Sequence, residues 1–440
     1  MINWTKYEIN RGIANKTFKN QNQVFYWPIE LEISSNHFIS KIRKPKIRNS
    51  IVLRLFYKHF CHFLPWNYVF EVQKTKERID SLFSSNLFFQ LPEGLGRYYE
   101  KLCDIFKKIS QSVFSLSVSC QVTYGACCIQ DCLAKKFCFS IVIHYGHSCL
   151  ISILNCIVSV IYIFIEIKYD FLFLIEGIKG IFCRQRDRLM VTSTIQFSSQ
   201  LKLIKGYMSK MFRFLTIPQT KPLSPGEVLG CTSFLTKDQS GVIYIGDGKF
   251  HIESVLYFNP NIKIIQFNPF TRSLILIGFK FTETLAEREN FIEKGLFFSR
   301  SCNFIFGGLG RQGNTKILKT LNFLADQKKM KNNIFITTEI ETSRLETLSG
   351  NLNNLWVQLS CPRISLDWGF YFKNLVITPF EFSILTRSTK WNKNFIPMDF
   401  YSKIGKFWSS YSLHKKQFVV KIVFDFYLIF KKYKYFKNFI

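Results

Sequence analysis

The order strand, turn, helix, cysteine-bearing turn and strand occurs three times along this chain, and it limits the possible folds more than any other feature. The three units open on apolar stretches that break into turn residues: NLFFQLPEG (86–94), STIQFSS (193–199) and NFIFGGLGRQGN (303–314). A segment of helical character follows each of them, at 97–109, 198–212 and 315–329. A recurring order of this kind is typical of repeated supersecondary units.

Each unit continues into a cysteine in a turn-like setting and then into a further strand. The cysteines are Cys127 in VTYGACC, Cys231 in VLGCTSF and Cys361 in QLSCPRI, and the strands are predicted at 139–148, 241–251 and 374–381. This order favours parallel strands joined by right-handed crossovers. Cysteines on loops near strand ends then lie where open α/β sheets keep their binding crevices. We therefore predict an α/β fold of three homologous domains with parallel sheets.

The repeat also sets the expected domain boundaries. A chain of 440 residues is too long for one compact core. We assign the first domain to 61–185, the second to 186–300 and the third to 301–395, each with one of the three cysteines. Residues 1–60 and 396–440 lie outside the repeat and are interpreted as N-terminal and C-terminal extensions.

One segment imitates a membrane span. Residues 145–165 contain no Asp, Glu, Lys or Arg and are long enough to cross a bilayer. They are also rich in β-branched residues, and buried parallel strands read as continuous apolar runs too. Because the repeat places two buried strands and a short connection here, we expect no membrane. The N-terminal MINWTKYEINRG has neither the apolar core nor the cleavage site of a secretory signal.

A formal net charge of +29 would ordinarily indicate a nucleic-acid partner. Here the basic residues are spread along the chain, and Phe, Lys, Ile and Asn are over-used together, which indicates a general compositional drift. We therefore expect no direct requirement for nucleic acid. The 13 cysteines do not form a small disulfide framework, so a reducing compartment is favoured. A basic RNA-binding protein whose cysteines are buried or bind zinc is an alternative.

Three cysteines that converge on one point would leave one coordination position of a metal centre open. Zinc with three protein ligands and a 4Fe–4S cluster held at three irons both suit thiolates without histidine. The local cluster motif CxxxCxxC is absent, and Cys128 and Cys132 in CCIQDC have only its first spacing. Packing as small buried thiols is the third interpretation.

Other polar motifs are less specific. GGLGRQGN (307–314) is a Gly-rich turn before a helix, which suits an anionic group at backbone N–H groups but is equally a tight strand–helix turn. It lacks the Lys-Ser/Thr pair of an NTPase loop and the spacing of a dinucleotide fingerprint. Isolated residues elsewhere have acid–base, metal or purely structural interpretations: Asp247, His251 and Glu253 in IGDGKFHIES, and His144 and His147 in HYGHS.

Five ordered motifs, YGACC, KPLSPGEVLGCTS, YIGDGKFHIES, GGLGRQGN and CPRISLDWG, resemble the diphthamide biosynthesis protein 1 family. The resemblance runs from about 64–75 to 398–408. It implies three homologous α/β domains around a central 4Fe–4S cluster whose ligands are Cys127, Cys231 and Cys361. The implied activity transfers a 3-amino-3-carboxypropyl group from S-adenosyl-L-methionine to C2 of a histidine in translation elongation factor 2, by a non-adenosyl radical mechanism. Because cluster and cofactor carry this chemistry, no catalytic side chain is assigned.

The same resemblance implies further residues and partners. Its cofactor-binding candidates are Gly310, Arg311, Gln312, Gly313 and Asn314 of GLGRQGN, Pro92, Glu93 and Gly94 after the first strand, and Asp247. Asp367 in LDWG is expected to shape the pocket together with Asp247. The implied setting is a cytoplasmic heterodimer with a related second subunit, and a small iron-binding protein as the electron donor. A non-catalytic scaffold of the same complex is the alternative function.

Overall fold

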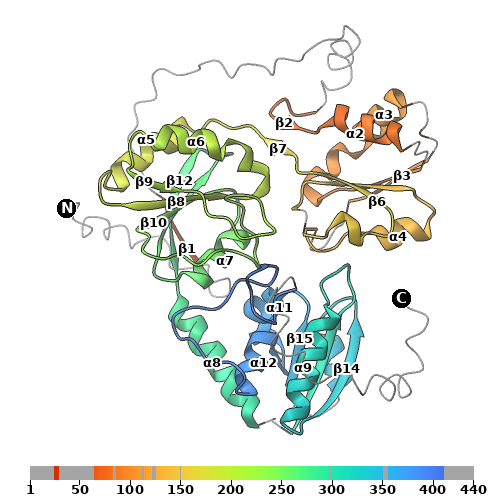
Figure 1. The fold of residues 1–440 in the computed structure, drawn as a ribbon, viewed down its shortest axis with the longest axis vertical. Helices are drawn as coiled ribbons and strands as arrows, with labels where there is room; N and C mark the ends of the chain where they lie inside the picture. Colours follow the sequence, from red (N-terminus) through yellow and green to blue (C-terminus); the bar gives the residue numbers. More distant parts are fainter. Residues whose placement is uncertain are drawn as a thin grey trace.

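The computed structural model describes residues 64–82, 86–110, 113, 115–120, 125–148, 150–297, 300–349 and 355–410, and the backbone of 24–28. Three sheets with their helices form the three bodies seen in Figure 1. The α/β class predicted from the repeat is confirmed. Residues 1–23, 29–63 and 411–440, which make up most of the two predicted extensions, lie outside the described residues.

The first sheet consists of four parallel strands in the order β4-β3-β5-β6. The strands are β3 (Asn86–Gln90), β4 (Ser115–Ser119), β5 (Ile141–Tyr145) and β6 (Ser159–Ile163). The helices are α2 (Val72–Ser81), α3 (Tyr99–Ile109) and α4 (Asp131–Lys136), and a short pair, β2 (Tyr68–Val69) with β7 (Glu166–Ile167), lies beside them. The membrane-like run 145–165 is thus the end of β5, a connection and β6, as the repeat predicted. None of the helices that the structure describes is both long and apolar enough to cross a membrane.

The third sheet has the same arrangement, with four parallel strands in the order β14-β13-β15-β16. The strands are β13 (Ser301–Gly307), β14 (Lys331–Thr337), β15 (Leu355–Leu359) and β16 (Leu375–Ile377). The helices are α9 (Thr315–Gln327), α10 (Thr342–Ser349), α11 (Pro362–Trp368) and α12 (Pro379–Leu385). In both sheets the first strand lies between the second and the third, so the connections diverge there, and open α/β sheets generally bind ligands at such a point.

The middle sheet differs from the prediction, because it is mixed rather than parallel. Its parallel part, β9-β8-β10-β11, repeats the order of the other two sheets. The strands β12 (Ser273–Phe279) and β1 (Val24–Pro28) then extend it in antiparallel fashion. The turn between β11 and β12 is too short for a crossover helix, so the chain must return antiparallel. The remaining elements are β8 (Arg188–Ser193), β9 (Phe214–Thr216), β10 (Gly241–Ile245), β11 (Lys263–Asn268), α5 (Leu172–Ile181), α6 (Leu201–Met208) and α7 (Phe250–Phe258).

The three cysteines do not occupy equivalent places in the repeat, which corrects the sequence-based register. Cys127 and Cys231 lie between the second and third strands of their units, whereas Cys361 lies between the third and the fourth. The sequence pattern named no strand between the first helix and the cysteine of any unit, so it omitted β4 and β9 in the first two units and both β14 and β15 in the third. The third unit was thus read one strand shorter than the other two. All three cysteines nevertheless follow the carboxyl end of a parallel strand, which is the edge at which such sheets bind ligands. The strand predicted at 193–199 also ends earlier, at Ser193, where a 3₁₀ turn (Ile195–Gln200) begins.

Two helices pack away from the domains to which the sequence assigned them. Leu174, Ile175 and Ile178 of α5 lie in the hydrophobic core of the middle sheet, although 185 was the expected end of the first domain. The long helix α8 (Phe281–Phe297) was assigned to the second domain, yet it packs against α12 and β16 of the third. Figure 1 shows α8 running from the middle sheet down along the third.

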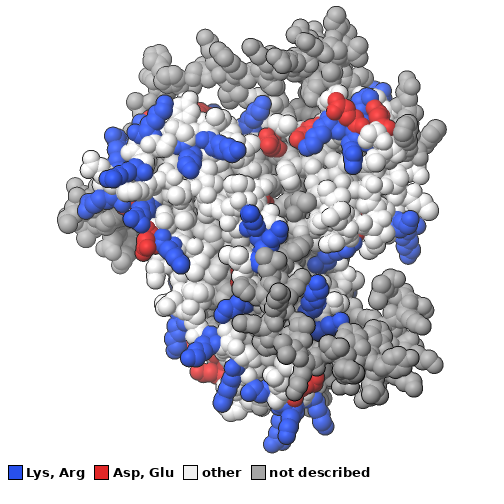
Figure 2. Space-filling model, viewed as in Figure 1, with Lys and Arg blue, Asp and Glu red and all other residues white. Residues whose placement is uncertain are grey.

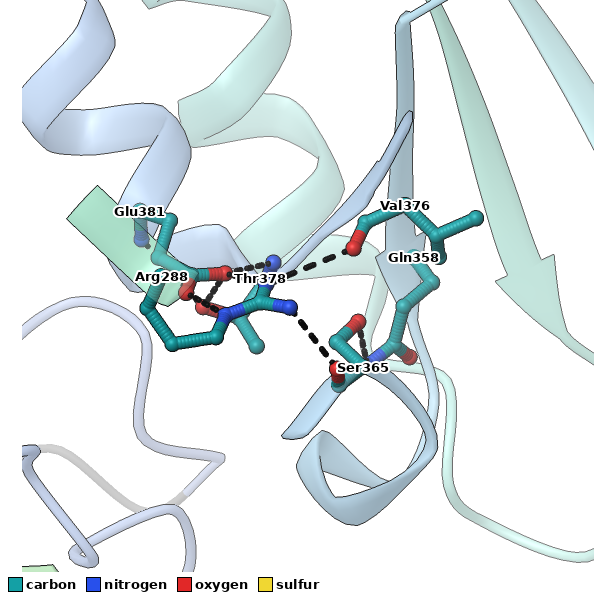
Figure 3. A network of polar contacts seen from close by, with 6 residues as sticks. All are labelled: Arg288, Gln358, Ser365, Val376, Thr378 and Glu381. Carbon is teal, nitrogen blue, oxygen red and sulfur yellow. Dashed lines mark hydrogen bonds and ion pairs between the residues drawn. The ribbon is translucent and has the colours of Figure 1, made fainter. Parts of the chain in front are cut away.

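A buried ion pair fixes α8 to the third unit (Figure 3). Arg288 and Glu381 are 3% and 2% exposed, and two hydrogen bonds of 2.6 Å join the guanidinium to the carboxylate. Arg288 also donates to the carbonyl of Ser365 in α11 at 2.8 Å and to that of Val376 at 3.4 Å. Glu381 in turn accepts from Thr378, with which it forms a capping box at the start of α12. One side chain therefore joins α8, α11, β16 and α12.

The basic residues form no single patch on the face drawn in Figure 2, where Lys and Arg side chains stand on many separate parts of the surface. This distribution agrees with the reading of the high positive charge as a compositional drift, because a nucleic-acid site gathers its cations on one face or along one helix.

Candidate metal centre

The structure brings the three cysteines together from three different sheets. Cys127 lies in a turn after β4, Cys231 in a loop after β9, and Cys361 at the start of α11 after β15. The thiols lie close enough to interact electrostatically, since Cys127 acts on Cys231 and both act on Cys361. The apolar cluster around them consists of Cys127, Cys128, Leu150, Leu223, Leu229, Phe400 and Tyr401, with Ala126, Cys231 and Leu309 packed against it.

Burial and mutual proximity oppose ionisation of these thiols. A hydrogen bond with Cys128 and then burial place the pKa of Cys127 well above the ordinary thiol range. Burial, followed by the neighbouring Cys127, raises the pKa of Cys231 to about 12. Burial also raises the pKa of Cys361 far above its usual value, and the other two cysteines add to the effect. Thiols in this setting need a compensating cation before they become thiolates.

The Cys231 loop is a tight turn held on both sides. Leu229 and Thr232 exchange backbone hydrogen bonds of 2.9 and 3.2 Å, so Gly230 and Cys231 form the tip. The following strand-like segment pairs with the chain near residue 400: Ser233 donates to the carbonyl of Met398 at 2.8 Å. Residues 396–410 therefore contact the site, although the sequence placed them in a C-terminal extension.

Cys361 is positioned by the glutamine at the end of β15 and by the first turn of α11. The Gln358 side chain donates to the Cys361 carbonyl at 3.0 Å and accepts from the Ser360 backbone at 2.8 Å. Ile364 donates to the same carbonyl at 3.1 Å. In the first unit Gln90, at the end of β3, has a similar role: it donates to the Cys128 carbonyl at 2.7 Å. Both glutamines are fully buried, so their hydrogen bonds are protected from water.

Arg363 connects the Cys361 helix to the Cys231 loop. Its guanidinium donates to the Gly230 carbonyl at 3.3 Å and to the Phe250 carbonyl at 2.7 Å. It forms ion pairs with Glu253 and, at 2.8 Å, with Asp367. The side chain is 4% exposed, and its charge favours the thiolate form of both Cys231 and Cys361. A buried, multiply bonded Arg of this kind fixes two segments relative to each other.

The loop 308–313 attaches the third unit to the Cys127 turn. Arg311 donates its backbone N–H to the Cys127 carbonyl at 3.0 Å, and Cys128 donates its thiol to the Leu309 carbonyl at 3.4 Å. The Arg311 guanidinium pairs with the buried Asp131 at 2.5 Å. Gly310 has a φ of +57°, and a Cβ there would stand 2.5 Å from the Cys128 Cα. The glycine is therefore required for both its backbone conformation and this close approach.

Gly310→Ala is expected to weaken this attachment more than its backbone strain alone explains. A positive φ costs an alanine about 1 kcal/mol, and forcing a methyl group into packed space adds about 1–3 kcal/mol. Gly248→Ala is the matched control, because Gly248 also has a positive φ, of +66°, but has open space where its Cβ would be. Thermal unfolding of both variants measures the difference, and equal losses would contradict the close packing of Gly310 on Cys128.

The first and second units also meet beside the cysteines. Ser148, in the loop after β5, donates its hydroxyl to the buried Glu227, and Gln196 donates to the Gly146 carbonyl at 2.8 Å. Burial raises the pKa of Glu227. Together with Arg311 and Arg363, these contacts show that all three units approach one another around the cysteine site.

The other candidates from the sequence are dispersed around this centre. Gln312 is buried next to Cys127 and accepts from Ser360, and its side chain forms a hydrogen bond with Cys127 that lowers the pKa of that thiol. Asn314 caps α9 and donates to the Ser410 carbonyl at 3.2 Å. Gln312 and Asn314 border one small pocket with Ser360, Phe400, Tyr401 and Trp408. Gly313 packs against Phe306 and is not in that lining.

The other five candidates are Pro92, Glu93, Gly94 and Asp247, which follow strands of the first and second units, and Asp367 in α11. Pro92 begins the turn after β3 and lies under Gly146, whereas Glu93 and Gly94 are exposed. Asp247 is exposed after β10 and acts on Tyr68 of the first unit, whose pKa is raised first by burial and further by Asp247. Asp367 accepts a hydrogen bond from the Arg363 guanidinium, and burial raises the pKa of the Asp367 carboxyl group.

The buried histidines show no metal-binding arrangement with each other. Burial lowers the pKa of His144 to about 3 and the pKa values of His147 and His251 to about 4. Among the described residues, no group of three or more His, Cys, Asp and Glu side chains is placed to hold a single metal ion.

Sequence reasoning missed four residues that build the site: Gln90, Gln358, Arg363 and Tyr401. Arg363 lies within the CPR motif that identified Cys361, so the motif carried a signal that was read only for its cysteine. Gln90 lies in a predicted strand, where a buried polar side chain is unusual, and Gln358 opens the stretch QLSCPRI that was read only for its cysteine. Tyr401 lies in 398–408, where the family resemblance ends, but this signal was not used because the segment was interpreted as part of a C-terminal extension.

The fold and site define a class: an α/β protein of three sheets with cysteines from three separate units at their junction. Within that class the chain belongs to the diphthamide synthesis family. The family described as "Putative diphthamide synthesis protein" matches residues 91–396. Two relatives, each called 2-(3-amino-3-carboxypropyl)histidine synthase subunit 1, come from Dictyostelium discoideum and Homo sapiens. They are 38% and 36% identical over 79% and 77% of this chain and 74% and 76% of their own lengths. The family is thus one of transferase subunits.

Solved structures support the same fold. Two crystal structures of Dph2 from Pyrococcus horikoshii, one of them with a 4Fe–4S cluster, superpose with TM-scores of 0.61 and 0.62. Each is 23% identical in sequence and covers 74% of this chain and 93% of the archaeal chain.

Proposed function

We propose that this chain transfers a 3-amino-3-carboxypropyl group from S-adenosyl-L-methionine to C2 of a histidine in translation elongation factor 2, the first step of diphthamide biosynthesis. The observation that carries the proposal is the meeting of three cysteines from three sheets at one buried site, in a chain of this family. The names of its relatives as histidine synthase subunits and the 4Fe–4S cluster in the archaeal Dph2 support it.

In the proposal, Cys127, Cys231 and Cys361 hold a 4Fe–4S cluster. The donor set fits, because three thiols without histidine suit iron–sulfur ligation. The irons also provide the positive charge that these buried thiols need to ionise. Three ligands leave one iron open for the cofactor.

The chemistry that the bound cluster supplies is the one-electron cleavage of a carbon–sulfur bond of S-adenosyl-L-methionine, in a non-adenosyl radical mechanism. The protein's own groups orient the cofactor and exclude water from it. Leu150, Leu223, Leu229 and Phe400 make the surroundings of the thiols apolar. This mechanism requires no pair of acid and base side chains, and the sequence motifs contain no such pair.

Among the cofactor-contact candidates we place Gln312 first. Its buried side chain is hydrogen-bonded to Cys127 and borders the small pocket, where an amide N–H group suits a carboxylate oxygen of the cofactor. Gly310 and Arg311 position this loop on the Cys127 turn, while Gly313 and Asn314 lead into α9. Pro92, Glu93, Gly94 and Asp247 are proposed to approach the cofactor from the first and second units. The proposed setting is the cytoplasm, where the chain forms a heterodimer with a second subunit. A small iron-binding protein is proposed to supply the electron that reduces the cluster.

The test is an anaerobic reaction of this chain, copurified with its second subunit, with elongation factor 2, S-adenosyl-L-methionine and dithionite. Peptide mass spectrometry is expected to show the added 3-amino-3-carboxypropyl group on one histidine of the factor. A factor with that histidine replaced by alanine is the substrate control. Full modification by a complex that contains Cys361→Ala would overturn the catalytic proposal in favour of the scaffold alternative.

A further inference from the structure

The segment 398–410 forms part of the cysteine site although it lies beyond residue 396, where the family match ends. Phe400 donates its backbone N–H to the carbonyl of Cys231 at 3.3 Å. Tyr401 donates its backbone N–H to the Thr232 hydroxyl at 3.1 Å. Two successive residues are thus fixed to the tip of the Cys231 loop, which determines where the Tyr401 side chain begins.

The same segment is closed on itself and fastened to the third unit. Ser410 donates to the Phe400 carbonyl at 2.7 Å, and its own carbonyl accepts from Asn314 at 3.2 Å. Trp408 donates from its indole to Asp399 at 2.8 Å. Because both ends are bonded, Tyr401 is held by a closed loop rather than by a free chain end.

The Tyr401 side chain lies among all three cysteines. It is 6% exposed and belongs to the apolar cluster that contains Cys127 and borders Cys231. Its phenol interacts electrostatically with Cys127, Cys231 and Cys361, and it is hydrogen-bonded to Cys127. A phenol at neutral pH carries its proton, so it is the donor in a bond to a thiolate sulfur.

We propose that Tyr401 is a positioning residue whose hydroxyl donates a hydrogen bond to Sγ of Cys127 and thereby raises the reduction potential of the cluster. The inference rests on the proposed function, since it concerns the cluster that Cys127 would hold. A donor directed at a ligand sulfur stabilises the reduced, more negative state of the cluster, and hydrogen bonds to sulfur are among the established determinants of cluster potentials.

The experiment is an EPR-monitored redox titration of the full chain with its second subunit, after anaerobic iron and sulfide reconstitution. Tyr401→Phe removes only the hydroxyl and is expected to move the midpoint potential to a more negative value at unchanged iron content. Tyr169→Phe is the matched control: Tyr169 is also buried and donates to the Phe197 carbonyl at 3.4 Å, in the middle unit. It is expected to leave the midpoint unchanged.

A second substitution separates hydrogen-bond strength from packing. Replacement of Tyr401 by 3,5-difluorotyrosine keeps the ring and strengthens the donor, so the midpoint is expected to move to a less negative value. If Tyr401→Phe loses iron, the direction of the midpoint shift in the difluorotyrosine protein is by itself the test of the inference. Equal midpoints in wild type and Tyr401→Phe, or shifts of one sign in both variants, would overturn the inference while the proposed function stands. A wild type that holds no cluster would overturn both.

Discussion

Arg363→Met is expected to destabilise the protein by about 3–5 kcal/mol, the cost of removing one partner from a buried ion pair. The guanidinium is bonded to Glu253, Asp367 and the carbonyls of Gly230 and Phe250. Methionine fills a similar volume but leaves two buried carboxyl groups and two carbonyls without their donor. Burial raises the pKa of both carboxyl groups, and Arg363 has the largest effect in the opposite direction. Chemical denaturation measures the loss.

The same substitution is expected to release the Cys231 loop from α11 and so to lower the iron content of the reconstituted protein. Arg363→Lys is the control for charge, because lysine keeps the cation but cannot donate in a fork to carboxylates and to two carbonyls at once. Compared with Arg363→Met, Arg363→Lys is expected to regain part of the free energy of unfolding but little of the iron content. Wild-type iron content in Arg363→Met would show that the Cys231 loop holds its position without this contact.

Arg288→Met is expected to cost a similar amount, about 3–5 kcal/mol, because it leaves the Glu381 carboxylate buried and unpaired. The double variant Arg288→Met with Glu381→Met removes both charges and is expected to regain much of the loss. Arg344→Met is the surface control: Arg344 is 46% exposed and its pairs at 3.8 Å are worth about 0–1 kcal/mol. Thermal unfolding of the three variants distinguishes these cases.

Arg288 and Arg363 together separate stability from site geometry. Arg288 contacts α11 and Arg363 belongs to it, but only Arg363 is bonded to the Cys231 loop. At equal loss of stability, Arg288→Met should therefore retain more iron than Arg363→Met. The reverse order would mean that the packing of α8 on the third unit, rather than the bridge between α11 and the Cys231 loop, positions Cys361.

The repeated order of strands, helices and cysteines was sufficient to predict the α/β class, because apolar runs and turn residues are local signals. It was not sufficient for register: Lys331–Thr337, which forms β14, opens on three polar residues and did not stand out as a strand, and the buried β15 was read only as the approach to Cys361. Nor did it show that β12 returns antiparallel, which depends on the short turn between Asn268 and Ser273. Neither the pairing of a strand nor its direction is a local signal.

The candidate site was predictable in its cysteines but not in what positions them. Arg363 bonds to Gly230 across 133 residues, and Arg311 to Asp131 across 180. A side-chain contact of that sequence separation leaves no periodicity to read in a single sequence. The contribution of Tyr401 shows the same limit, because it depends on a loop closing onto the Cys231 turn rather than on any local motif.

The most direct test of the central claim, that one cluster is held by Cys127, Cys231 and Cys361, is the iron content and EPR spectrum of single alanine variants. Each variant is purified anaerobically with the second subunit, reconstituted and reduced with dithionite. Cys128→Ala and Cys132→Ala are the controls, because they remove the locally spaced pair in CCIQDC. We predict that each of the three substitutions diminishes the cluster signal while both controls retain it. A signal that survives all three, or one that Cys128→Ala removes as completely as Cys127→Ala does, would contradict the account.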